Sequence, residues 1–155
     1  MDEYTYIEFL IEDKSGSILV EKIMDKYVMD KENLTYKIHG FKGIGKIPLE
    51  ANKISQIKSK RLLTDLPMYL KGMDASFKNM PGKKAIFVIL DSDDENCVDI
   101  KHSLVRMYQE LEISTQVFFC IAIEEMEAWL LGDSEALVMA YPMAKRPLLQ
   151  RYVQD

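Results

Sequence analysis

The stretch "KKAIFVILDSDDEN" at residues 83–96 joins an unbroken apolar run to a cluster of acids. The run from residue 85 to residue 90 is rich in β-branched and aromatic side chains and is short for a helix. A continuous apolar run of this kind indicates a strand that is buried on both faces, as in parallel sheets. We therefore expect a central strand whose carboxyl end presents Asp91, Asp93 and Asp94.

Three other short apolar runs predict further strands, and helical patterns lie between them. The strands are expected at residues 4–12, 34–40 and 114–123. Helices are expected at residues 18–29, 62–80 and 97–112, with a break near Gly72 in the second and with Val98, Ile100, Leu104, Val105, Tyr108 and Leu111 facing inward in the third. Strands that alternate with helices predict an α/β fold, with a mostly parallel central sheet of about four strands and helices on both faces.

The composition is that of a globular protein, and we expect one domain over residues 1–155. A net charge of −5 argues against a surface that binds nucleic acid everywhere. The two cysteines are too few for a disulfide framework. The acidic start is unlike a signal peptide, and no apolar run approaches the roughly 20 residues of a membrane span, so we expect a cytoplasmic protein with no membrane partner. At the other end, we expect either further helices beyond Asp155 in the natural protein or a C-terminal stretch that folds back weakly.

Acids follow three of the four expected strands. They are Glu12 and Asp13 after the first strand, Asp91, Asp93 and Asp94 after the third, and Glu124, Glu125 and Glu127 after the fourth. The carboxyl ends of parallel strands meet on one rim of the sheet, where ligands of such folds bind. Several like charges on one rim favour a compensating cation, and carboxylates are the ligands that Mg²⁺ prefers. The alternative is that Asp93 or Asp94 only caps the following helix.

A resemblance supports the metal-site interpretation. The segments "IEDKSGSILVEKIM", "HG", "LDSDDENC" and "EEMEAWLLGD" together resemble an uncharacterised bacterial family of Toprim-like proteins. The Toprim fold is shared by topoisomerases, primases and overcoming-lysogenization-defect nucleases. Each motif is short, but their order and spacing between residues 7 and 133 are fairly specific.

The resemblance implies a Toprim-like fold and assigns roles to several acids. Glu12 is the expected metal ligand or general acid/base, and Asp91 and Asp93 are the expected ligands of Mg²⁺ or Mn²⁺. Glu125 and Glu127 match the third acidic motif of the family, and since they are two residues apart, one is expected to be a ligand while the other caps a helix or faces solvent. In the proposed chemistry, Glu12 or a neighbour such as Glu125 is expected to transfer protons.

The chain also departs from the family pattern. Many relatives carry Glu where this chain has Ser17, and often a basic residue where it has Glu124. The first departure implies one bound ion or weak catalysis.

The loop "HGFKGIGKIP" at residues 39–48 resembles part of a Walker A motif but lacks its essential features. Ile47 and Pro48 follow the lysine where a Ser or Thr should bind Mg²⁺, and the loop follows the second strand. Lys42 and Lys46 instead begin a basic stretch, and with His39 they are the expected phosphate-binding residues. The alternative is a solvated, mobile loop.

Together these features predict a metal-dependent phosphoesterase, specifically a nuclease that cleaves nucleic-acid phosphodiesters in phage defence or in DNA or RNA processing. The alternative is a non-catalytic Toprim-like module that binds nucleic acid or a protein partner in a defence or toxin system. Cleavage that requires a divalent ion separates the two.

Overall fold

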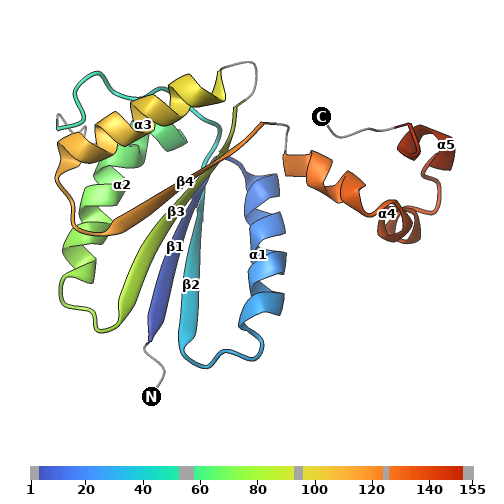
Figure 1. The fold of residues 1–155 in the computed structure, drawn as a ribbon, viewed down its shortest axis with the longest axis horizontal. Helices are drawn as coiled ribbons and strands as arrows, with labels where there is room; N and C mark the ends of the chain where they lie inside the picture. Colours follow the sequence, from blue (N-terminus) through green and yellow to red (C-terminus); the bar gives the residue numbers. More distant parts are fainter. Residues whose placement is uncertain (1–3, 53–57, 93–95, 124–125, 152–155) are drawn as a thin grey trace.

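The computed structural model describes residues 4–52, 58–92, 96–123 and 126–151. Its elements are β1 (Thr5–Ile11), α1 (Lys14–Val28), β2 (Leu34–Gly40), α2 (Leu62–Phe77), β3 (Lys83–Asp91), α3 (Cys97–Leu111), β4 (Gln116–Ala122), the 3₁₀ helix η1 (Met126–Gly132), α4 (Ser134–Ala140) and α5 (Arg146–Leu149). The four strands form one parallel sheet in the order β2-β1-β3-β4 (Figure 1). The predicted α/β fold is confirmed, and it is consistent with a Toprim-like arrangement.

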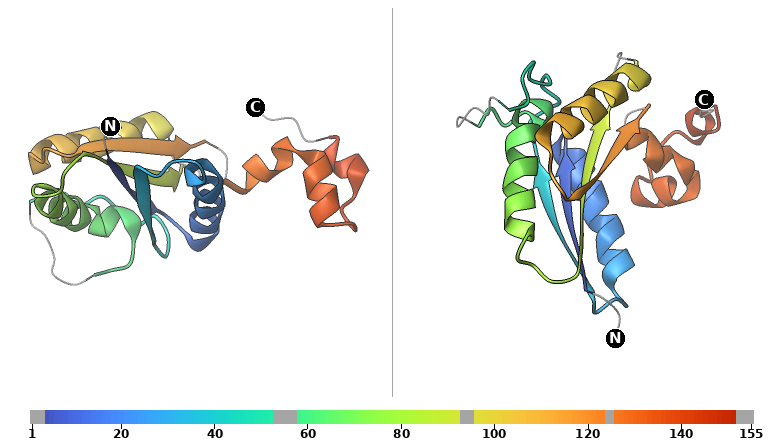
Figure 2. Two further views of the ribbon diagram at one scale, coloured as in Figure 1. Left: turned by 90° about the horizontal axis from the view of Figure 1, so that it is seen from below. Right: turned by 60° about the vertical axis from the view of Figure 1, so that its left-hand side comes forward.

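Helices cover both faces of the sheet, as predicted. On one face α2 and α3 enclose the larger core (Figures 1 and 2). Its most deeply buried side chains are Leu10, Leu62, Leu66, Leu70, Ile86, Val88, Leu90 and Leu104. On the other face α1 packs against β1 and β2, and the smaller core contains Phe9, Ile11, Val20, Met24 and Ile89. Strands that pack on both faces need apolar side chains at successive positions, which explains their unbroken apolar runs.

Helix α2 does not break at Gly72, contrary to the sequence prediction. Glycine costs about 1 kcal/mol in a helix interior. Here Leu70, Met73 and Phe77 are buried on either side of it, and Gly72 itself is exposed. Tertiary packing therefore outweighs the local preference.

Helix α3 also differs from expectation in the side chains that it buries. Ile100, Leu104 and Leu111 are buried as predicted. Val98 is 54% exposed and Val105 is 37% exposed, so their predicted inward orientation is wrong. Helical spacing shows which residues form an apolar stripe. It does not show which residues of that stripe extend beyond the edge of the sheet and stay exposed.

The C-terminal helices lie to one side of the sheet, beyond α1 (Figures 1 and 2). No residue of α4 or α5 is buried. Asp133 caps α4 by accepting a hydrogen bond from Ala136 N–H at 2.9 Å. Within the described residues, no helix has both the length and the apolar character needed to cross a bilayer.

A buried carboxylate on α2 holds the turn that precedes β4. Asp74 Oδ1 accepts hydrogen bonds from the backbone N–H and the hydroxyl of both Ser114 and Thr115, at 2.8 to 2.9 Å. Burial favours the neutral acid, but the hydrogen bonds from Thr115 and Ser114 outweigh it and lower the pKa of Asp74. The ionised carboxylate therefore fixes the start of β4 against α2.

Asp74→Ala is expected to lower the free energy of unfolding by about 3 kcal/mol, because two amides and two hydroxyls lose their acceptor. Asp74→Asn keeps an oxygen at this position and is expected to cost about 1 kcal/mol. Because the folded pKa of Asp74 is lowered, the contribution of its charge is present above the unfolded pKa and is lost as pH falls through the folded pKa. Denaturant unfolding at neutral and acid pH measures both effects, with the exposed Asp30→Ala as control. Equal stability of the three variants contradicts this role.

Candidate functional site

The parallel pairing of β1 with β3 brings two predicted acids together at the carboxyl edge of the sheet. Ile11, the last residue of β1, lies opposite Ile89, two residues before β3 ends at Asp91. Glu12 N–H donates to Ile89 O at 3.1 Å, and Asp91 N–H donates to Glu12 Oε2 at 3.0 Å. The Glu12 carboxylate is therefore held at the end of β3. Both acids are half-buried, and Asp91 Oδ1 is inaccessible to solvent.

The other acids of the rim divide into one with a structural role and several that lie outside the described residues. Asp13 caps α1, because its Oδ1 accepts a hydrogen bond from Gly16 N–H at 2.8 Å and its other oxygen accepts one from the Ser15 hydroxyl. Asp93 and Glu125, the remaining predicted site acids, lie outside the described residues. Among the residues that are described, no group of three or more His, Cys, Asp and Glu is arranged to hold a metal ion.

Two carboxylates are nevertheless a donor set that suits Mg²⁺. This ion usually takes one or two protein carboxylates and completes its octahedron with water and substrate phosphate. Glu12 and Asp91 supply carboxylates of this kind at a half-buried sheet edge, where Asp91 N–H donates to one oxygen of Glu12. By their chemistry, these two side chains suit a divalent cation.

The glycine loop that follows β2 uses its amides within the protein. Lys42 N–H donates to Lys60 O at 2.8 Å, and Gly43 N–H donates to Glu12 O at 2.9 Å. Lys46 N–H donates to Thr64 Oγ1 at 3.1 Å. A Walker A loop needs such amides for phosphate. These bonds are consistent with the conclusion from the sequence that the loop is not a Walker A motif.

Two glycines are required by the path of this loop rather than by a ligand. Gly43 has a φ of 106° and Gly45 a φ of 71°, which side chains disfavour. A Cβ at Gly45 would also lie 2.6 Å from Arg61 Cβ and from Thr64 Oγ1. The glycines let the loop pack closely against the start of α2.

This packing gathers basic side chains beside the two acids. Lys42 N–H bonds to Lys60 O and Leu62 N–H bonds to Gly43 O, so the two segments lie side by side. Lys42, Lys60 and Arg61 are exposed there, and we call them the basic cluster. Since Gly43 bonds to the carbonyl of Glu12, the cluster adjoins the acidic edge. The sequence indicated a basic stretch but not this pairing.

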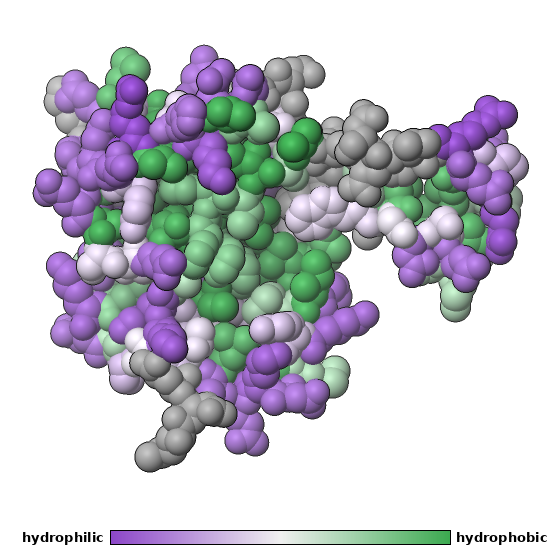
Figure 3. Space-filling model, in the orientation of Figure 1, coloured by the Kyte–Doolittle hydropathy of each residue, from purple (hydrophilic) through white to green (hydrophobic). Residues whose placement is uncertain are grey.

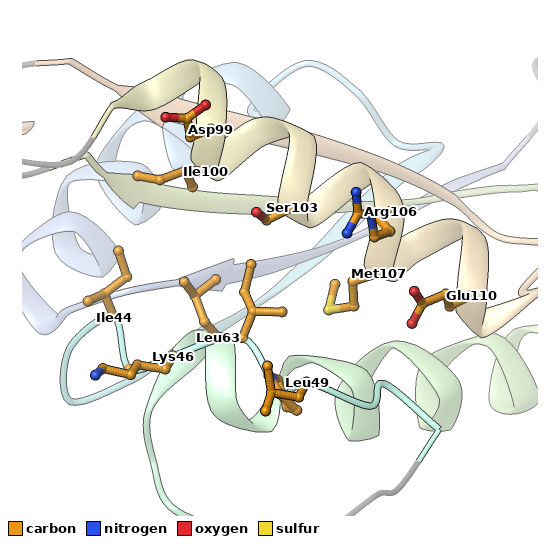
Figure 4. A pocket seen from close by; sticks show the side chains of 13 residues that line it. Ile44, Lys46, Leu49, Leu63, Asp99, Ile100, Ser103, Arg106, Met107 and Glu110 are labelled. Atoms are coloured by element: carbon orange, nitrogen blue, oxygen red, sulfur yellow. The ribbon is translucent and has the colours of Figure 1, made fainter.

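Lys46, the other predicted phosphate ligand, lies in a groove between the loop and α3 (Figure 4). The groove has a volume of about 400 Å³. Ile44 and Leu63 lie on one side of it, and α3 on the other side contributes both the apolar Met107 and charged residues, among them Arg106. The groove begins at the loop that contacts Glu12 and runs along α3.

His39 has a protein partner that the sequence did not indicate. Its Nε2 lies 2.5 Å from Glu8 Oε2, and Tyr6 O–H donates to Glu8 Oε1 at 2.8 Å. Burial raises the pKa of Glu8, but the hydrogen bonds from His39 and Tyr6 outweigh it and lower that pKa. Burial and the bond to Glu8 raise the pKa of Tyr6 to about 12. A phosphate-binding role of His39 stays a prediction.

The comparisons with known proteins give no relative. No protein-family model matches the chain, and neither a curated protein nor a solved structure matches it significantly.

A double-mutant cycle of Glu8→Gln and His39→Gln tests the structural role of His39. We expect the two substitutions to be non-additive by about 1 kcal/mol in the free energy of unfolding, because the carboxylate and the imidazole contact each other. Denaturant unfolding at neutral pH measures the coupling. Additive effects, together with weaker phosphate binding in His39→Gln, would instead support the phosphate role.

Proposed function

We propose that this chain is a phosphoesterase dependent on Mg²⁺ or Mn²⁺, and specifically a nuclease that cleaves nucleic-acid phosphodiesters in the cytoplasm. The observation that supports it best is the bond from Asp91 N–H to Glu12 Oε2, because it places two acids from distant parts of the sequence on one edge. The resemblance to Toprim-like proteins adds the expectation that these two acids bind metal.

In this proposal Glu12 and Asp91 hold the divalent ion. A bound ion of this kind polarises the scissile phosphate and lowers the pKa of its bound water. Asp91 N–H donates to Glu12 Oε2 at 3.0 Å, and this bond holds the Glu12 carboxylate at the end of β3. Asp93 as a further ligand and Glu125 as a proton carrier stay predictions.

The charges next to this edge support a nucleic-acid substrate. The chain has a net charge of −5, so attraction of a polyanion must be local. The basic cluster supplies three exposed cations beside Glu12. Such cations bind phosphates of the nucleic-acid backbone independently of base sequence. Together these charges suit a phosphodiester chain that reaches the acids along the protein surface.

Substitution of either acid is expected to abolish cleavage. Glu12→Gln and Asp91→Asn keep the shape of the side chains but remove the charges that bind the ion, so we expect rates at least about 100-fold lower. The measurement is cleavage of labelled DNA and RNA, single- and double-stranded, with Mn²⁺, Mg²⁺ or a chelator. Asp30→Asn, which replaces an exposed acid after α1, is the matched control.

Two results would contradict the proposal. One is cleavage that continues in the chelator, and the other is cleavage that survives both substitutions. Nucleic-acid binding that needs no divalent ion and leads to no turnover would support the non-catalytic module instead.

Removal of the basic cluster is expected to weaken the binding of nucleic acids to a similar extent for all base sequences. In the triple variant of Lys42→Ala, Lys60→Ala and Arg61→Ala, the slope of log affinity against log salt concentration should become less negative by about 2 to 3. Fluorescence anisotropy of labelled oligonucleotides over a salt series measures this slope. Lys22→Ala and Lys26→Ala on α1 serve as the control, and an equal effect of the control would show that the cluster has no special role.

A further inference from the structure

The two edges of the sheet differ in their protection. Strand β2 carries the exposed Lys37, and exposed charge is a common means of preventing edge-to-edge association. Strand β4 has the sequence QVFFCIA, without a charge or a proline, and among the described strands only β3 pairs with it. Its outer edge therefore presents backbone groups that suit another strand.

Apolar side chains are exposed on both sides of this edge. On the side of α1, Phe118 is 39% exposed and stacks on Phe87 with 4.8 Å between ring centroids. Cys120 on the same side is also exposed. On the side of α3, Val98 and Val105 of the helix are exposed apolar residues. Figure 3 shows hydrophobic side chains gathered over the sheet between α1 and α3. An apolar patch of this kind marks an interaction surface.

Helix α3 contributes a stripe that follows the edge. At helical spacing, Val98, Lys101, Val105, Tyr108 and Glu112 fall on one side of the helix. Tyr108 O–H donates to the carbonyl of Thr115, just before β4, at 3.0 Å. Lys101 lines a hollow with side chains of β4 near its carboxyl end. The stripe therefore runs alongside β4 over its whole length.

The charges of this stripe have opposite signs at its two ends. Lys101 lies near Ile121 and Ile123 at the carboxyl end of β4. Glu112 ends α3 in a left-handed conformation, shortly before the amino end of β4. Both side chains are exposed. A second β4 placed antiparallel to the first would bring each Lys101 toward the Glu112 of the other copy, twice by symmetry.

We propose that β4 pairs antiparallel with β4 of a second copy of this chain, so that one sheet runs through a two-fold symmetric dimer. A two-fold interface requires a surface that is complementary to itself when reversed. The positive end, apolar middle and negative end of the α3 stripe meet this requirement. The edge amides and carbonyls of β4 then gain partners, and Val105 and Phe118 leave water.

A charge swap tests the dimer. Sedimentation velocity and light scattering over a concentration series are expected to show a dimer of the full chain. Lys101→Glu and Glu112→Lys each place like charges together, so each should raise the dissociation constant by about tenfold or more. The double variant restores opposite charges and should recover the dimer. Lys26→Glu on α1 is the matched control.

Several outcomes would overturn the proposal. A chain that stays monomeric at every concentration would show that β4 does not bind a second copy, including the case in which another protein supplies the strand. A dimer that neither single variant weakens, or that the double variant does not restore, must use another surface.

Hydrogen exchange gives an independent measurement. The amides of β4 should exchange more slowly as the protein concentration rises, because half of them face the new partner strand. Unchanged exchange in β4 would show that the strands do not pair, even if the chain dimerises. Since Glu12 and Asp91 do not lie in this surface, Glu12→Gln should dimerise as the wild type does, which separates this test from that of the proposed nuclease.

Discussion

The parallel pairing of β1 with β3 is the constraint on which the site depends. Glu12 and Asp91 are far apart in the sequence, and they meet because Ile11 and Ile89 share one level of the sheet. A shift of one residue in this register would turn the apolar side chains of β1 to the opposite faces. Leu10 and Ile11 are fully buried on opposite faces, so the cores that stabilise the sheet also fix the acids.

The loop that follows β2 contributes to the site through its backbone path and not through a phosphate-binding motif. Gly43 and Gly45 have backbone angles that permit a close turn, and the amides of the loop bond to the protein. The loop lies against the segment that carries Lys60 and Arg61, so its own Lys42 joins them in an exposed positive surface. The negative edge and the positive surface are thus joined through the bond between Gly43 and the Glu12 carbonyl.

The sequence predicted the strands closely, because a strand buried on both faces leaves an apolar run that needs no knowledge of its neighbours. It also predicted that acids end these strands. It did not predict the contact between Glu8 and His39, which is made across two strands and leaves no local pattern. The exposure of Val98 and Val105 was missed for a similar reason, since helical spacing contains no information on where a sheet ends.

Binding of one divalent ion by Glu12 and Asp91 can be measured by titration with Mn²⁺, followed by electron paramagnetic resonance of the free ion. We expect a bound ion in the wild type and a large loss of affinity in Glu12→Gln and in Asp91→Asn, while circular dichroism shows that both variants are folded. Equal Mn²⁺ affinity in the wild type and in the two folded variants would contradict this expectation.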